Sequence, residues 1–323
     1  MKNKLKIVYL GTPEFAVKPF LKLLSAKDEF EILAAVTNTD RPVGRKQIIT
    51  APPVKLAAKE NNIPVLQYDK IKIEGVDDLK SLNPDILITC AFGQILSQEI
   101  IDIPKYGILN IHASLLPKYR GASPINYAIA NGEKETGVTI MRTDAGIDTG
   151  DILTQKSIKI GEKENVSELS ERLSELGADM IVEALRLVVN GKAEFKKQDD
   201  SLATHTKLIK KEDLKIDFNK SATEVANFVR AFSPVPAAYC LLNGETIKIY
   251  SCSVSNEKVG ASECVGAEKN VRVGEIIRDD KVLEVACGQG SVLIEELQKS
   301  GGKILSVKAF LSGARNLKGE ILN

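Results

Sequence analysis

The sequence predicts a doubly wound, mostly parallel α/β domain followed by a small β-barrel domain. The chain has 323 residues, whereas domains average roughly 150, so two domains are expected. The first half alternates short apolar runs with segments of helical periodicity, and the last third holds short strand-like runs between glycine-rich turns. We expect one domain over residues 1–190, a polar linker over 191–206 and the second domain over 207–323.

The elements of the first domain follow from periodicity. Fully apolar, β-branched runs separated by helices predict a parallel sheet that is covered on both faces. The expected strands are 6–10, 31–37, 85–90, 107–112, 137–142 and 152–159, and the expected helices are 15–24, 54–61, 124–131 and 166–189. Ligands of such sheets bind beyond the carboxyl ends of the strands. Functional residues should therefore follow Leu10, Thr37, Cys90 and His112.

The second domain begins with a helix over 221–232, for which Ser221 is the expected N-cap. Short strand candidates with turn residues between them follow, and their spacing predicts a small barrel. These candidates are 238–242, 246–251, 271–277, 282–286 and 291–297.

Composition excludes several classes of protein. Apolar residues make up 43% and charged residues 27%, and the net charge is +1, so disorder and a globally basic nucleic-acid binder are excluded. Five scattered cysteines without a Cys-x-x-Cys pair, and only two histidines, argue against a zinc site and fit a reducing compartment. The first apolar run is too short for a signal peptide or a membrane span, so we expect a cytoplasmic protein with no membrane or metal partner.

Asn110 and His112 are the first candidates for chemistry. Alternate residues of a strand share a face, so both side chains should point the same way at the carboxyl end of an inner strand. Histidine is the side chain whose ordinary pKa lies near neutrality, and an asparagine amide can donate to a developing oxyanion. The alternative is a structural histidine beside a turn asparagine.

Two loops follow. The segment SLLPKYRGASP, residues 114–124, is long and proline-rich, which favours a binding loop over an ordinary surface connection. The segment DAGIDTGD, residues 144–151, holds three aspartates. It could be a turn or a calcium loop, although its acid spacing does not fit the helix-loop-helix pattern, or one aspartate could orient His112.

Two groups of cations could bind phosphate. Arg41, Arg45 and Lys46 lie in a loop at the binding edge, and Lys207, Lys210 and Lys211 cluster past the expected linker. Either group could instead be an ordinary solvated surface. The Gly-Thr-Pro after the first strand is not the dinucleotide fingerprint, and no Walker A sequence exists, which disfavours NAD and ATP.

Taken together, four motifs make the chain resemble the 10-formyltetrahydrofolate-dependent formyltransferases. They are the opening GTPEFA, Asn110-x-His112, SLLPKYRG and ETGVTIMRTDAGIDTGD. The elements HxSLLP and GxDTGD, matched in order and separation, are specific to that family. DRPVGRK followed by PPVK, together with VRAFSPVPAAY, further resembles the branch that acts on initiator methionyl-tRNA.

The resemblance implies a Rossmann-like first domain, an OB-like second domain that holds the tRNA body, and 10-formyltetrahydrofolate as formyl donor. It implies that Asn110, His112 and Asp148 are catalytic. It further implies that folate is held by Ser114, Leu115, Leu116 and Pro117 with the backbone of Phe92 and Gly93, and that the acceptor end of the tRNA contacts the DRPVGRK loop.

Two departures and two alternatives accompany the resemblance. The loop reads GRKQII, less basic than the GRGKK form common in relatives, and the second domain lacks tryptophan. The chain could instead formylate a sugar nucleotide or another small amine. It could also be a non-catalytic folate- or RNA-binding module, although such a module has no need of the complete set of Asn110, His112 and Asp148.

Overall fold

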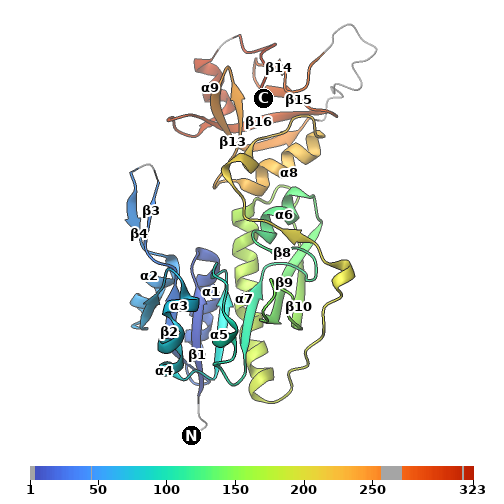
Figure 1. Cartoon of the computed structure of the whole chain (residues 1–323). Coiled ribbons are helices and arrows are strands. Elements are labelled where there is room, and N and C mark those ends of the chain that lie inside the picture. The colour runs from blue at the N-terminus through green and yellow to red at the C-terminus, as the bar shows by residue number, and fades with distance from the viewer. Residues whose placement is uncertain (1–3, 45, 256–270, 315) are drawn as a thin grey trace. The chain divides into compact units, whose positions relative to one another are not determined.

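The structure is a computed structural model, and it describes residues 4–44, 46–255, 271–314 and 316–323 (Figure 1). The chain divides into two compact units, each of which is described by itself. Unit 1 comprises Met1–Gly121, Thr136–Ile158 and Ser170–Thr206, and unit 2 comprises Ala122–Glu135, Lys159–Leu169 and Lys207–Asn323.

Unit 1 is built on a seven-stranded sheet with the strand order β10-β9-β7-β6-β1-β2-β5. All pairs among β7, β6, β1, β2 and β5 are parallel, whereas β9 runs antiparallel to β7. The predicted doubly wound, mostly parallel sheet is therefore confirmed. The strands are β1 (Leu5–Gly11), β2 (Phe30–Thr37), β5 (Val65–Gln67), β6 (Ile86–Cys90), β7 (Ile108–His112), β9 (Glu135–Arg142) and β10 (Ile152–Lys159).

Helices cover both faces of this sheet because successive strand residues point to opposite sides. On one face Val8 and Leu10 pack with Ile71, Leu79 and other apolar residues of α3, α4 and α5. On the other face the Tyr9 ring packs at a tilt against Phe20 of α1, with ring centroids 5.3 Å apart. The helical elements of the unit are η1 (Glu14–Ala16), α1 (Val17–Ser25), α2 (Pro53–Glu60), α3 (Ile71–Glu74), α4 (Val76–Leu82), α5 (Gln98–Ile101), η2 (Asp200–Leu202) and α7 (Val166–Val189), whose first residues belong to unit 2.

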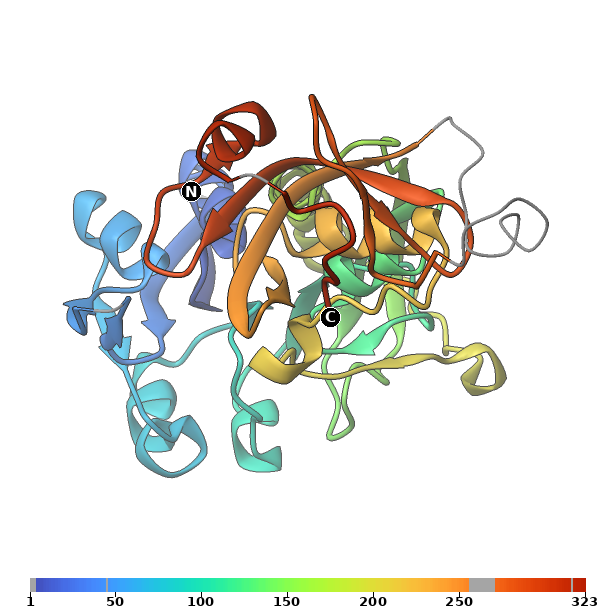
Figure 2. The same ribbon diagram turned by 90° about the horizontal axis from the view of Figure 1, so that it is seen from above.

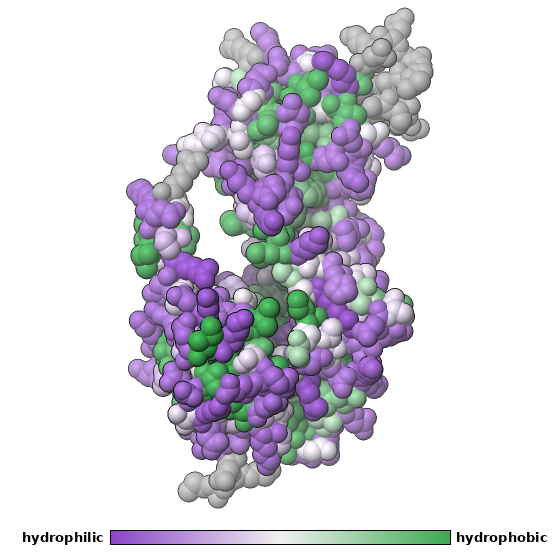
Figure 3. All heavy atoms as spheres, in the orientation of Figure 1, coloured by the Kyte–Doolittle hydropathy of each residue, from purple (hydrophilic) through white to green (hydrophobic). Residues whose placement is uncertain are grey.

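The basic segment after β2 is a two-stranded antiparallel hairpin, not the loop expected from the sequence. Strands β3 (Arg41–Val43) and β4 (Ile48–Thr50) pair Arg41 with Thr50 and Val43 with Ile48. The hairpin projects from the sheet (Figure 1), and its apolar side chains lie in solvent (Figure 3). Its strands were missed because each has only three residues and no buried face.

Unit 2 contains a curled antiparallel sheet with the strand order β12-β13-β16-β15-β14, and β17 pairs with β16 (Figure 2). Helix α8 packs on β13 and β16 over a core that includes Val225, Val229 and Ile249. The expected small barrel-like sheet is confirmed. The strands are β12 (Ala238–Leu242), β13 (Glu245–Val254), β14 (Ile276–Arg278), β15 (Leu283–Ala286), β16 (Ser291–Lys299) and β17 (Leu305–Ser306).

The remaining elements of unit 2 are helical. They are α6 (Pro124–Ala130), η3 (Lys211–Leu214), α8 (Ala222–Phe232) and α9 (Val307–Gly313). Ser221 caps α8 as predicted, because its hydroxyl accepts from the Glu224 amide while the Glu224 carboxylate accepts from the Ser221 amide. The strand expected over 271–277 was too long, since β14 begins only at Ile276. No helix in the described residues is both long and apolar enough to cross a membrane.

Candidate active site

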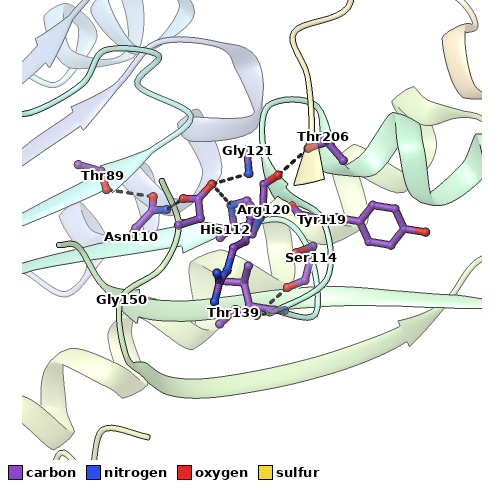
Figure 4. Close-up of polar contacts among 12 residues, drawn as sticks. Thr89, Asn110, His112, Ser114, Tyr119, Arg120, Gly121, Thr139, Gly150 and Thr206 are labelled. Carbon is purple, nitrogen blue, oxygen red and sulfur yellow. Dashed lines mark hydrogen bonds and ion pairs between the residues drawn. The ribbon is translucent and has the colours of Figure 1, made fainter. Parts of the chain in front are cut away.

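The site begins where one face of the sheet changes from apolar to polar. Leu87 of β6 and Ile108 of β7 belong to the core under α3, α4 and α5. Two residues further along, the same face carries Thr89 and Asn110, and His112 follows on β7. The predicted shared face of Asn110 and His112 is what the structure shows (Figure 4).

The strand register places Thr89 directly beside Asn110. The parallel pairing of β6 with β7 aligns these two residues, and the Thr89 hydroxyl donates to the Asn110 Oδ1 at 2.9 Å. Because Oδ1 is engaged as an acceptor, the amide nitrogen faces the opposite direction, toward Asp148.

Asp148 joins the two strand residues from the connection between β9 and β10. Its Oδ1 lies 3.3 Å from the Asn110 Nδ2, and its Oδ2 lies 3.5 Å from the His112 Nδ1. The Gly121 amide donates to the same Oδ2 at 2.8 Å. Asp144 has a different task, since its carboxylate closes the turn by accepting from Gly146 and Thr149. The tertiary structure therefore places Asp148, and not Asp144, beside the two strand residues.

His112 is held between two acceptors. Its side chain is only 7% exposed, its Nε2 lies 3.0 Å from the Tyr119 carbonyl oxygen, and its Nδ1 faces the Asp148 carboxylate. A carbonyl and a carboxylate oxygen can only accept, so only an imidazole with a hydrogen on both nitrogens donates to both. The ring is therefore held in one orientation, with Nδ1 toward Asp148 and Nε2 toward Tyr119.

Cys90 ends β6 close to these groups but is no nucleophile. Burial raises the pKa of its thiol to about 12, so the thiolate needed for attack is absent near neutral pH.

The SLLP loop is fixed by hydrogen bonds of its own. The Ser114 hydroxyl donates to the Lys118 carbonyl at 2.6 Å, and the Leu116 amide donates to the Thr139 hydroxyl at 3.2 Å. Ser114 and Leu116 are buried, whereas Leu115 and Pro117 are half-buried. The Ser114 hydroxyl is thus already engaged, and the loop presents a fixed backbone instead of free polar side chains.

Phe92 and Gly93 lie just past the carboxyl end of β6. The Phe92 side chain is buried, and its carbonyl accepts from the Thr12 hydroxyl at 3.2 Å and from the Asn38 amide at 3.1 Å. Gly93 is exposed with φ of 80°, a conformation that favours glycine. The ends of β1, β2 and β6 are therefore joined at the edge where ligands of such sheets bind, with the Gly93 backbone open to solvent.

The predicted phosphate-binding cations are exposed wherever the structure describes them. Arg41 and Lys46 are exposed on the hairpin, and Arg45 lies outside the described residues. In unit 2, Lys207 and Lys211 are exposed, and Lys210 is also exposed with its Nζ 3.9 Å from Glu212.

The sequence analysis missed two residues of the site. Thr89 could have been found from the parallel pairing of two predicted strands, because it is the polar residue opposite Asn110. Gln198, whose side-chain amide contacts the Asp148 backbone, lies in the polar segment expected to be a linker. Nothing in its local sequence signals that contact.

Comparisons with known proteins agree with the geometry. The formyl transferase family model matches residues 5–185, and the model of the formyl transferase C-terminal domain matches residues 208–315. The chain is 46% identical to the methionyl-tRNA formyltransferase of Geobacter sulfurreducens, over 96% of this chain and 94% of that one. It is 41% identical to the enzyme of the same name from Bacillus velezensis, over 98% of this chain and 97% of that one.

Solved structures with a similar fold include formyltransferases with other substrates. WlaRD, a sugar 3N-formyl transferase crystallised in the presence of dTDP and 5-N-formyl-THF, matches with a TM-score of 0.65 and 25% identity. The match covers 93% of this chain and 100% of that one. HypX from Aquifex aeolicus in complex with tetrahydrofolic acid matches with a TM-score of 0.64 and 16% identity, over 96% of this chain and 47% of that one, which shows a common fold.

Proposed function

This chain belongs to the methionyl-tRNA formyltransferase family, and we propose that it transfers the formyl group of 10-formyltetrahydrofolate to the α-amine of initiator methionyl-tRNA. One observation carries the proposal. A single carboxylate, that of Asp148, lies within 3.5 Å of both the Asn110 amide and the His112 ring at the carboxyl end of the sheet. Formyl transfer needs an oxyanion donor, a cationic group and a proton acceptor at one point, and this cluster supplies all three.

The α-amine is the nucleophile. A free α-amine has a pKa of about 7.7–8.0, and the neighbouring ester of aminoacyl-tRNA lowers it, so the neutral amine is available near pH 7. It attacks the formyl carbon directly, forming a tetrahedral oxyanion without a covalent enzyme intermediate. The carbon–nitrogen bond to the folate nitrogen 10 then breaks, and that nitrogen takes up the proton that the amine released, which Asp148 transfers.

Asn110 is the proposed oxyanion donor. One hydrogen of its Nδ2 is directed at Asp148, which leaves the second for the oxyanion, and Thr89 keeps the amide in this orientation. A preorganised donor of this kind contributes about 3 kcal/mol to transition-state stabilisation. Asn110→Ala should therefore lower kcat on the order of 100-fold while the protein stays folded.

His112 and Asp148 share the charge and proton steps. The imidazolium stabilises the oxyanion by its positive charge, and Asp148 both pairs with the ring and accepts the proton released by the amine. The contacts of His112 with Tyr119 and Asp148 support a ring held in one orientation for this role.

Binding assignments complete the proposal. Folate is held by Ser114, Leu115, Leu116 and Pro117 together with the backbone of Phe92 and Gly93. Residues 1–190 form the catalytic domain, residues 191–206 connect it to residues 207–323, and the protein acts in the cytoplasm. The tRNA is bound through phosphate contacts of Arg41, Arg45, Lys46, Lys207, Lys210 and Lys211.

A four-substrate assay tests the function. The protein is mixed with 10-formyltetrahydrofolate and, in parallel, with charged initiator methionyl-tRNA, uncharged initiator tRNA, a charged elongator tRNA or an amino-sugar nucleotide. Formyl-methionine confined to the charged initiator is the expected result. Product on the sugar nucleotide alone would move the protein to the sugar branch of the family, and folate binding without any product would leave only a binding module.

A further inference from the structure

We propose that Gln198 is a positioning residue that sets the place of the Asp148 carboxylate. The side chain of Gln198 lies against the connection that carries Asp148, and the residue is only 6% exposed. Its Nε2 donates to the Asp148 carbonyl at 2.9 Å and to the Gly150 carbonyl at 2.7 Å. Both hydrogens of one amide therefore hold the backbone on the two sides of Thr149. The inference rests on the proposed function, since it concerns a group of the proposed catalytic cluster.

Arg120 fixes the orientation of the Gln198 amide. The guanidinium donates to the Gln198 Oε1 twice, from Nε at 3.0 Å and from Nη2 at 2.9 Å. Arg120 is 3% exposed, and its Nη2 also pairs with Asp200 at 2.7 Å. Because a guanidinium can only donate, it selects the amide oxygen, and the amide nitrogen must face the two carbonyls.

The contacts close into a ring around Asp148. The residue after Arg120 is Gly121, whose amide donates to the Asp148 carboxylate. Asp148 is thus held twice: its carboxylate by Gly121, and its backbone by Gln198, which Arg120 in turn orients. The segment that bears Gln198 is itself tied down, because β11 (His205–Thr206) pairs in parallel with β8 (Arg120–Gly121).

This ring of contacts matters because Asp148 has an unfavourable backbone conformation. Asp148 has φ of 52°, in the left-handed region that residues other than glycine rarely adopt. Without the Gln198 bonds, the residue can relax toward ordinary backbone angles, which swings its carboxylate away from Asn110 and His112. Gln198 touches no reacting atom and acts only through Asp148.

Two substitutions separate the contacts of Gln198. Gln198→Glu keeps an oxygen that accepts from Arg120, so the buried guanidinium keeps its partner. The second carboxylate oxygen, however, cannot donate to the backbone carbonyls of Asp148 and Gly150. Gln198→Met keeps the length of the side chain and removes both sets of bonds. We expect kcat to fall by about 10–100-fold in both variants while KM for folate and for tRNA stays within about twofold.

A spectroscopic measurement reports on position without activity. The chain contains only two histidines, so the ring protons of His112 and His205 can be resolved by NMR and assigned by substituting the exposed His205. In both Gln198 variants the His112 signals should shift, because the Asp148 carboxylate opposite the His112 Nδ1 moves. The His205 signals should shift no more than they do in the Ser174→Ala control. This readout holds even if the chain formylates a different amine.

Ser174→Ala is the matched control for stability. Ser174 is 2% exposed and its hydroxyl donates to the Phe15 carbonyl at 2.7 Å, away from the Asp148 connection in the sequence and in the hydrogen-bond network. It should lower Tm without changing kcat or the His112 signals. The proposal is overturned if the Gln198 variants keep wild-type kcat, if their His112 signals do not move, or if Ser174→Ala produces the same loss of kcat at the same fall in Tm.

Discussion

The hydroxyl of Thr89 donates to the Oδ1 of Asn110 across two adjacent parallel strands, and this bond decides which way the Asn110 amide points. Thr89 is only 8% exposed, so its hydroxyl needs an acceptor within the protein, and the Asn110 Oδ1 provides it. The amide nitrogen is then left for Asp148 and for the oxyanion. The orientation of the Asn110 amide therefore depends on a residue of the neighbouring strand.

Thr89→Val removes this bond while keeping the shape of the side chain. The Asn110 amide then loses its preferred orientation, at a cost of about 1 kcal/mol, or a factor of about five in kcat. Thr89→Ser keeps the hydroxyl and should retain most of the activity. Steady-state kinetics with charged initiator tRNA measure the effect, and equal kcat for the valine and serine variants would show that Thr89 does not orient Asn110.

Gly150→Ala should disturb the connection that carries Asp148. A β-carbon at this position would overlap the backbone carbonyl oxygen of Arg142, so the backbone itself must shift. We expect kcat to fall more than about tenfold, because even a shift near 1 Å misplaces a catalytic group. Gly313→Ala is the control, since its β-carbon would enter open space. Steady-state kinetics and thermal unfolding of both variants measure the effect. Equal kcat for Gly150→Ala and Gly313→Ala would contradict the prediction.

Arg41→Ala should weaken tRNA binding and leave folate binding unchanged. Arg41 is exposed on the projecting hairpin, and a lost phosphate contact lowers the dependence of the binding constant on salt by about one unit of the log–log slope. The measurement is the tRNA dissociation constant at several salt concentrations, next to the folate KM. Lys27→Ala, a change at an exposed cation after α1, should alter neither. An equal loss of affinity for both substrates would argue against a local phosphate contact.

Lys55→Met should lower the stability of the hairpin base in a pH-dependent way. Lys55 donates to both oxygens of Asp40 at 2.7 and 2.8 Å. Hydrogen bonding from Lys55, and to a smaller extent from Gln67, lowers the pKa of the Asp40 carboxyl. At a pH between the lowered pKa of Asp40 in the folded protein and its unfolded value of about 3.9, the unfolded chain binds more protons than the folded protein. The stabilisation is therefore complete above about pH 3.9 and disappears as the pH falls through the lowered value.

Denaturant unfolding of wild type and Lys55→Met from pH 7 to pH 3 measures this difference. The free energies of unfolding should differ at neutral pH, and the difference should become smaller as the pH falls below about 3.9. Lys72→Met, at an exposed lysine of α3, provides the control and should show a difference that does not depend on pH in this range. A Lys55 difference that stays constant down to pH 3 would show that Asp40 is not the group involved.

Most of the fold could be predicted from local patterns. The strands β10 and β12 and the helix α7 have the expected bounds, because long periodic or continuous apolar segments leave one way to bury them. The hairpin β3–β4 was missed because its exposed apolar residues, Val43 and Ile48, have no buried face to create a pattern. The short helix α5 was missed because four residues are too few to show a period.

The sequence by itself determined the chemistry and its location: an asparagine and a histidine on one face of a strand, at the edge where ligands of a parallel sheet bind. Alternation along a strand is a local rule, so Asn110 and His112 had to share a face. The tertiary structure shows the contacts of these residues. It places Asp148, which spacing could not distinguish from Asp144 and only the family resemblance indicated, next to Asn110 and His112. It also places Thr89 beside Asn110 and brings Gln198 to the Asp148 backbone from 50 residues further along the chain. Contacts of that range depend on how strands and connections pack together, and no local pattern of residues encodes them.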